Sequence, residues 1–298
     1  VCSQWADGWK ATSEGRRRLT RVACDFPRDL LGIHATLRMA VIPGGDEQLA
    51  VRSGPTVRTL AHNMSSGASF EILDGPGDVA ASEQFLHATA LGEKRVRCLT
   101  HDGTEVASYE DPDKNISCPT LAPCGILFCV LYEEDDDTQD EIIALDAQTM
   151  ELRYRFGLSL LNDVRGMVMV GEELFLCDKG NDRLQVFSLA GEHRRSITGD
   201  WKRPIALCFV KDRLYLVEEQ NDNTDEEGEL INPIPGRRIL VLSLQGDTLE
   251  VYTNPVEEQT FTESLCYFDS KLLAPVQLQD AQSGIPSEVV GVLALRGL

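Results

Sequence analysis

The sequence predicts an all-β fold, a six-bladed β-propeller built of four-stranded antiparallel blades. The first supporting observation is a unit of strand, turn, strand, loop, strand, turn, strand that recurs about every 40 to 50 residues, the period of propeller blades. The second is the residue pattern within each unit, in which short apolar runs are bounded by turns rich in Gly and acidic residues. Together these observations predict one ring-shaped domain covering residues 1–298.

The clearest unit spans residues 166–197. Apolar strands at 167–170 and 174–177 flank a Gly-Glu-Glu turn, and a polar loop at 178–182 leads to an alternating strand at 183–189. A second Gly turn then introduces a mostly polar last strand. The six predicted units cover approximately residues 35–73, 77–109, 118–156, 164–197, 203–253 and 262–297.

The last unit lacks a fourth strand, whereas the segment before the first unit contains a strand that belongs to no unit, residues 18–24. If that N-terminal strand completes the last blade, every blade has four strands and the ring is closed. The alternative is that residues 1–34 form an independent extension, with Trp5 and Trp9 packed on the surface.

Composition narrows the classes of partner. The chain has 48 acidic and 28 basic residues and a formal net charge of −20, which argues against nucleic-acid binding and favours a partner with a basic surface or peptide. No apolar run approaches the roughly 18 to 20 residues of a membrane span, so membrane insertion is not expected. Nine cysteines, several inside apolar runs, favour a reducing intracellular compartment, cytoplasmic or organellar, over secretion.

Residues of the clearest unit also carry a family resemblance. The unit resembles the NHL repeat, in which a strand ends in Asp, a loop contains Asn, an Arg opens the next strand and an apolar pair precedes a Gly turn; the matching residues are Asp178, Asn181, Arg183, Val186, Phe187 and Gly191. The resemblance implies a six-bladed propeller and a structural pairing of Arg183 with a loop carboxylate such as Asp178. It implies no function, because NHL-like propellers serve ligases, RNA regulators, receptors and lyases alike.

Acidic residues gather in the loops between second and third strands of three consecutive units. In a propeller these loops emerge on the face that also carries the connections between blades, so they are expected to form an acidic rim that steers a basic partner. The alternative is that they are solvated loops that only keep the protein soluble. The candidate partner-binding residues are Glu133, Glu134, Asp135, Asp136, Asp137, Asp182, Asp222, Asp225, Glu226 and Glu227.

A metal site is a second hypothesis. Lactonase-like propellers hold a cation with carboxylates and an Asn at the mouth of the central channel, and Asn162, Asp163 and Glu263 precede predicted innermost strands. These residues would suit Ca²⁺, although they are also the residue types that cap strands and form turns. The stretch at 221–232 does not meet the EF-hand pattern, because it lacks Gly at the sixth position and Glu at the twelfth.

The sequence therefore favours a non-enzymatic protein-interaction propeller, a scaffold or subunit of a larger assembly, without a cofactor. The alternative is a Ca²⁺-dependent hydrolase of the lactonase-like kind, so the question of enzymatic activity stays open. No nucleophile elbow, phosphate loop or dinucleotide fingerprint is present to decide it.

Overall fold

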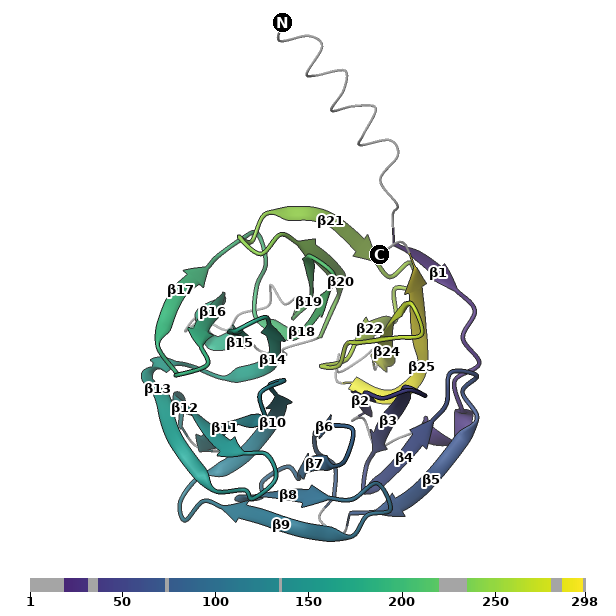
Figure 1. The fold of residues 1–298 in the computed structure, drawn as a ribbon. Coiled ribbons are helices and arrows are strands. Elements are labelled where there is room, and N and C mark those ends of the chain that lie inside the picture. The colour runs from purple at the N-terminus through teal and green to yellow at the C-terminus, as the bar shows by residue number, and fades with distance from the viewer. Residues whose placement is uncertain are drawn as a thin grey trace, which may run out of the picture.

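The computed structural model is a ring of six antiparallel sheets around a central channel, as predicted (Figure 1). It describes residues 19–31, 37–72, 75–133, 136–219, 235–279 and 286–296. In the first five blades the strands follow one another from the channel outward in chain order. The second strands of the blades are buried almost without interruption, which shows that each sheet packs on both faces.

Each of the first five blades has four strands. The first three blades contain β2 (Leu37–Ile42), β3 (Gln48–Ser53), β4 (Thr56–Leu60) and β5 (Ser66–Glu71); β6 (Val79–Ala81), β7 (Leu86–Thr89), β8 (Arg95–Leu99) and β9 (Glu105–Glu110); and β10 (Asn115–Leu121), β11 (Ile126–Glu133), β12 (Asp136–Asp146) and β13 (Leu152–Leu161). The next two contain β14 (Val164–Val170), β15 (Glu173–Asp178), β16 (Arg183–Ser188) and β17 (His193–Ile197); and β18 (Pro204–Val210), β19 (Arg213–Glu219), β20 (Pro235–Leu242) and β21 (Thr248–Thr253).

The sixth blade joins the two ends of the chain. Its inner strand is interrupted, as β22 (Gln259–Phe261) and β23 (Cys266–Phe268), and is followed by β24 (Lys271–Gln279) and β25 (Pro286–Arg296). The N-terminal strand β1 (Thr20–Val22) pairs antiparallel with β25 and forms the outer edge, which confirms the predicted closure of the ring (Figure 1). The structure thus favours closure over the independent-extension alternative for the described part of the N-terminal segment.

One acidic stretch differs from its prediction. Residues 133–141 were expected to form a loop, but β11 continues to Glu133 and β12 begins at Asp136, with these two residues paired in register. Backbone ladder bonds do not depend on apolar side chains, so the hairpin continues past the hydrophobic run that marks its buried part. The apolar pattern therefore underestimates the length of this strand pair.

The hydrophobic core lies between the blades. Six clusters of buried side chains each join two neighbouring sheets, and Leu19, just before β1, completes the cluster between the fifth and sixth blades. Trp201 is 1% exposed and packs in the cluster between the fourth and fifth blades. In the described residues no helix is long and apolar enough to cross a membrane; the two helices are single 3₁₀ turns, η1 (Arg28–Leu30) and η2 (Lys179–Asn181).

A glycine in the turn between third and fourth strands brings neighbouring blades close together. Gly191 has a φ of +78°, and a Cβ there would lie 2.7 Å from the ring of Phe156 in the preceding blade. Gly103 and Gly246 make the same kind of approach to the blade before theirs, and both also have positive φ. The Gly turn of the repeat therefore serves packing between blades as well as chain reversal.

Candidate functional site

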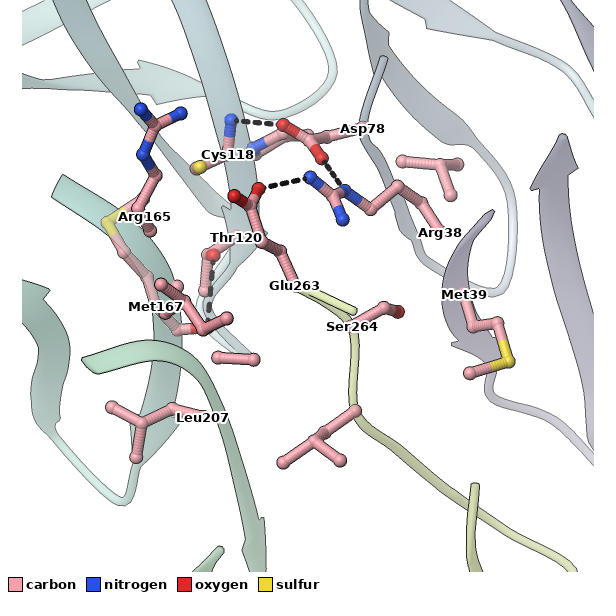
Figure 2. Close-up of a pocket in the computed structure, with 16 residues that line it drawn as sticks. Arg38, Met39, Asp78, Cys118, Thr120, Arg165, Met167, Leu207, Glu263 and Ser264 are labelled. Carbon is pink, nitrogen blue, oxygen red and sulfur yellow. Dashed lines mark hydrogen bonds and ion pairs between the residues drawn. The ribbon is translucent and has the colours of Figure 1, made fainter. Parts of the chain in front are cut away.

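The innermost strands of the blades begin at one mouth of the central channel, and charged side chains gather there (Figure 2). Each comes from the first residues of an innermost strand or from the segment that leads into it, so one position of the repeat recurs around the ring. The residues at this position are Arg38 on β2, Asp78 before β6, Cys118 on β10, Arg165 on β14 and Glu263 between β22 and β23. The fifth blade contributes the apolar Ile205 on β18.

Arg38 joins two carboxylates from different blades. Its Nε lies 2.5 Å from Oδ1 of Asp78, and its Nη2 lies 2.7 Å from Oε2 of Glu263 (Figure 2). The other oxygen of Asp78 accepts a hydrogen bond of 3.0 Å from the backbone N–H of Cys118. Cys118 lies at an interruption of the β10–β11 register and has a φ of +51°, which frees its N–H from the ladder for this contact. Four blades, the sixth, first, second and third, are thereby linked at the channel mouth.

A second charged group lies on the fourth and fifth blades. Asp163 is 2.7 Å from Nε of Arg165 through one oxygen and 2.9 Å from Nζ of Lys179 through the other. Lys179 also lies 3.3 Å from Glu219, whose second oxygen is 2.5 Å from Nε of Arg203. The side chains of Lys179 and Glu219 are each only 6% exposed, so this network lies in a largely dry environment.

The two groups together form a chain in which carboxylates and cations alternate. Burial of ions is costly unless each is paired, and here four carboxylates and four cations balance one another. The eight residues, hereafter the mouth network, are Asp78, Arg38, Glu263, Arg165, Asp163, Lys179, Glu219 and Arg203.

Five members of the mouth network are kept ionised by their partners. Burial would raise the pKa of Asp78 and of Glu263, but the charge of Arg38 holds both pKa values below their usual range. Burial likewise opposes ionisation of Asp163, yet Arg165 and Lys179 lower its pKa. The pKa values of Arg38 and Arg165 are raised, since the neighbouring carboxylates outweigh the effect of burial. The neighbouring Cys118 is instead kept neutral, because burial and the charge of Asp78 raise the pKa of its thiol well above the usual value.

A cavity of about 450 Å³ opens beside these residues. This volume lies within the range of about 300 to 1,000 Å³ that is typical of small-molecule sites. Its lining includes charged members of the mouth network and Asp140, together with Pro76, Ala90, Leu91 and Tyr132. The cavity therefore combines ionic and apolar lining residues.

The residues predicted as metal ligands are only partly brought together. Asp163 and Glu263 line the same cavity, but each faces cations of the mouth network. Asn162 instead holds the loop after β15: its N–H donates to Asp178 at 2.8 Å and its carbonyl accepts from Gly180 at 3.0 Å. Among the described residues no group of three or more His, Cys, Asp and Glu is arranged to hold a metal. This donor set does not fit a divalent cation, because Arg38 and Arg165 already provide positive charge there.

The predicted partner-binding residues that the structure describes differ in their surroundings. Asp182 accepts hydrogen bonds from the N–H of Arg203 at 2.7 Å and from Nζ of Lys202 at 3.2 Å, and it therefore joins two blades. Glu133 is half exposed and 3.5 Å from Nζ of Lys114. Asp136 and Asp137 belong to the first residues of β12. The others lie outside the described residues: Glu134, Asp135, Asp222, Asp225, Glu226 and Glu227.

Sequence reasoning missed Arg38, Asp78, Cys118 and Arg165 as site residues. A signal was available, because Arg38, Asp78 and Cys118 recur at intervals of 40 residues, each near the start of a predicted innermost strand. Polar side chains at a position that is otherwise apolar would have stood out if the units had been aligned on their innermost strands.

Comparison with known proteins shows the fold. No protein-family model matches the chain, and neither does any curated protein sequence. Among solved structures, the chain resembles a luciferin-regenerating enzyme with a TM-score of 0.64 and 13% identity, over 94% of this chain and 95% of that one. It also resembles a chain of a nidogen/laminin complex, with a TM-score of 0.59 and 15% identity over 74% of this chain and 81% of that one. A third similar structure is the computationally designed Ika8 protein, with a TM-score of 0.50 and 15% identity over 85% of this chain and 70% of that one. The chain is thus a six-bladed β-propeller, and its resemblance to the NHL repeat stays a prediction.

Proposed function

We propose that the protein is a non-enzymatic interaction propeller, a scaffold or subunit of a larger intracellular assembly, whose acidic face receives a basic partner. The observation that carries this proposal is how the positive charges are used. At the channel mouth Arg38, Lys179 and Arg203 are bound by carboxylates within the chain. Each of them is neutralised within the chain, so the net charge of −20, which already counts every Lys and Arg, reflects an excess of carboxylates that can act on a partner.

The chemistry of the mouth supports a binding role. The described residues that line the cavity include no histidine, and Asp78, Asp163 and Glu263 there are ionised and paired with cations. A general acid or base needs a pKa near the working pH, whereas these carboxyl groups have lowered pKa values. The one thiol in the wall, Cys118, has a raised pKa and is therefore a poor nucleophile.

The ends of two described strands support an acidic face at the channel mouth. Asp178 pairs with Val164 and Glu219 pairs with Pro235, so β15 and β19 both end on the side of the mouth. A similar propeller occurs in a nidogen/laminin complex, and interaction is a common use of this fold. The buried thiols of Cys129 and Cys177 are consistent with the proposed reducing compartment.

The first test compares two charge-neutralised variants. We expect a fluorescent lysine-rich peptide to bind the protein more weakly by about tenfold between about 50 and 500 mM NaCl, because salt screens exposed charges. The variant Asp135→Asn/Asp136→Asn/Asp137→Asn should bind about tenfold more weakly at low salt, measured by fluorescence anisotropy. Equal affinity for this variant and the wild type would contradict the acidic face.

The matched control removes three exposed carboxylates from turns at the opposite ends of the blades, namely Asp46, Glu172 and Asp212. The variant Asp46→Asn/Glu172→Gln/Asp212→Asn changes the net charge equally and should affect peptide binding much less. If both variants weaken binding to the same degree, total charge rather than the acidic face is responsible.

A Ca²⁺-dependent hydrolase is the second candidate, favoured by the cavity at the channel mouth and by the likeness to an enzyme, the luciferin-regenerating enzyme. The pairing of Asp163 and Glu263 with cations leads us to expect no change in Tm at about 1 mM Ca²⁺, a concentration that saturates most protein calcium sites. A rise in Tm that Glu263→Gln abolishes would instead favour the hydrolase.

A further inference from the structure

We propose that the channel-mouth cavity binds a small organic monocarboxylate, and that the guanidinium of Arg165 is the group that binds it. This inference goes beyond the interaction role, because it assigns a small-molecule site to the cavity itself. It rests on the contacts and exposure of the Arg165 side chain, on the carboxylates around it and on the apolar residues that line the cavity.

Arg165 differs from Arg38 in what its terminal nitrogens contact. Arg38 uses Nε for Asp78 and Nη2 for Glu263. Arg165 forms an ion pair with Asp163, with 2.7 Å between Nε and the carboxylate but without hydrogen-bond geometry, and its two terminal nitrogens have no hydrogen bond or ion pair among the described residues. Its side chain remains 39% exposed and lines the cavity, and Figure 2 shows it separate from the bonded trio around Arg38.

The guanidinium is held in place for a ligand. Arg165 lies on the innermost strand β14, and Asp163, which holds Nε, is itself fixed by Lys179 at 2.9 Å. An arginine fixed in this way offers two N–H groups in a plane, a geometry that matches the two oxygens of a carboxylate. Little conformational entropy remains to be lost when an anion binds.

The surrounding carboxylates limit the charge of the ligand to one. Asp140, Asp163 and Glu263 line the same cavity as Arg165. A ligand with two negative charges, such as a phosphate monoester, would bring its second charge close to these carboxylates and be repelled. A single carboxylate needs only one cationic partner and leaves the mouth network paired.

The apolar lining of the cavity indicates what kind of group the ligand carries besides its carboxylate. Pro76, Ala90 and Leu91 are apolar, and Leu91 is 68% exposed although it is a large hydrophobic residue. An apolar group of the ligand would cover this side chain and gain hydrophobic free energy from doing so. The cavity volume of about 450 Å³ admits a branched or aromatic acid rather than a macromolecular segment.

The test uses pairs of probes that differ only in charge. We expect isovalerate and benzoate to bind, measured by ligand-observed NMR and calorimetry, and their neutral amides to bind at least about tenfold more weakly. Inorganic phosphate should not compete with them. Leucine, added as a third carboxylate, shows whether an ammonium group is tolerated beside Glu263. If none of the three carboxylates binds more tightly than its amide, the proposal is wrong.

Variants then locate the site. Arg165→Gln should reduce the affinity for isovalerate or benzoate at least about tenfold, and Arg165→Lys should retain part of it, because the charge remains but the planar fork is lost. The matched control is Arg194→Gln on β17, whose side chain is 51% exposed and pairs with Glu192. Unchanged Tm in Arg165→Gln shows that the loss is local. Binding that survives in a folded Arg165→Gln variant would overturn the assignment, whatever becomes of the acidic face.

Discussion

We expect Asp178→Ala to lower the free energy of unfolding by about 3 to 5 kcal/mol, the range for removing one partner of a buried ion pair. Asp178 is 0% exposed and accepts hydrogen bonds from the N–H of Asn162 at 2.8 Å, from Asn181 at 3.0 Å and from Nε of Arg183 at 2.7 Å. The substitution leaves these three donors, one of them charged, without their acceptor. Thermal and urea unfolding measure the effect, which corresponds to a fall in Tm of roughly 10 °C.

Two further variants separate the causes. Asp178→Asn keeps one oxygen acceptor while removing the charge, so it should be less destabilising than Asp178→Ala. Asp212→Ala is the matched control, since that side chain is 84% exposed, and it should change the unfolding free energy by no more than about 0.5 kcal/mol. A loss in Asp178→Ala no larger than in this control would contradict a structural role for the buried carboxylate.

The second large effect is expected at the channel mouth. Arg38→Met should lower the free energy of unfolding at pH 7 by about 3 kcal/mol, because Asp78 and Glu263 remain buried without their cation. We expect the lower end of the usual range, since the side chain of Glu263 is 30% exposed and solvent screens part of its charge. Adding Asp78→Asn and Glu263→Gln to Arg38→Met should recover most of this loss.

The effect of Arg38→Met depends on pH. Folded-state pKa values of Asp78 and Glu263 lie below their ordinary values, so their contribution to stability is present above about pH 4 and is lost as pH falls through the folded pKa values. In the variant the carboxyl groups lose that support and are easier to protonate. The difference in stability between wild type and variant should therefore narrow from pH 7 towards pH 3, and a constant difference would exclude this ion-pair explanation.

The fold was predictable because its signals are local and repeated. Each blade can be identified from its apolar runs and turns within about 45 residues, and the recurrence of this pattern in six imperfect copies supports the assignment of each. The pairing of Arg183 with Asp178 was predictable for the same reason, since the two residues are five positions apart on either side of one loop. The described structure confirms both predictions.

The site was harder to predict because its contacts join distant parts of the chain. Arg38 and Glu263 are 225 residues apart, and only closure of the ring brings them together. A carboxylate before a strand looks the same in sequence whether it will bind a metal, cap a strand or meet an arginine. Glu263 and Asp163 were identified as channel residues, but the arginines that neutralise them were not, because single polar residues within apolar strands carry no motif.

Closure by the N-terminal strand has a consequence for biosynthesis. Thr20 pairs with Arg296, which lies 276 residues later, so the ring cannot be completed until β25 has left the ribosome. Until then β1 has no strand to pair with, and a free strand edge can add to another chain. Strand β1 is therefore made long before its partner, and the slowest step of folding should be the pairing of β1 with β25.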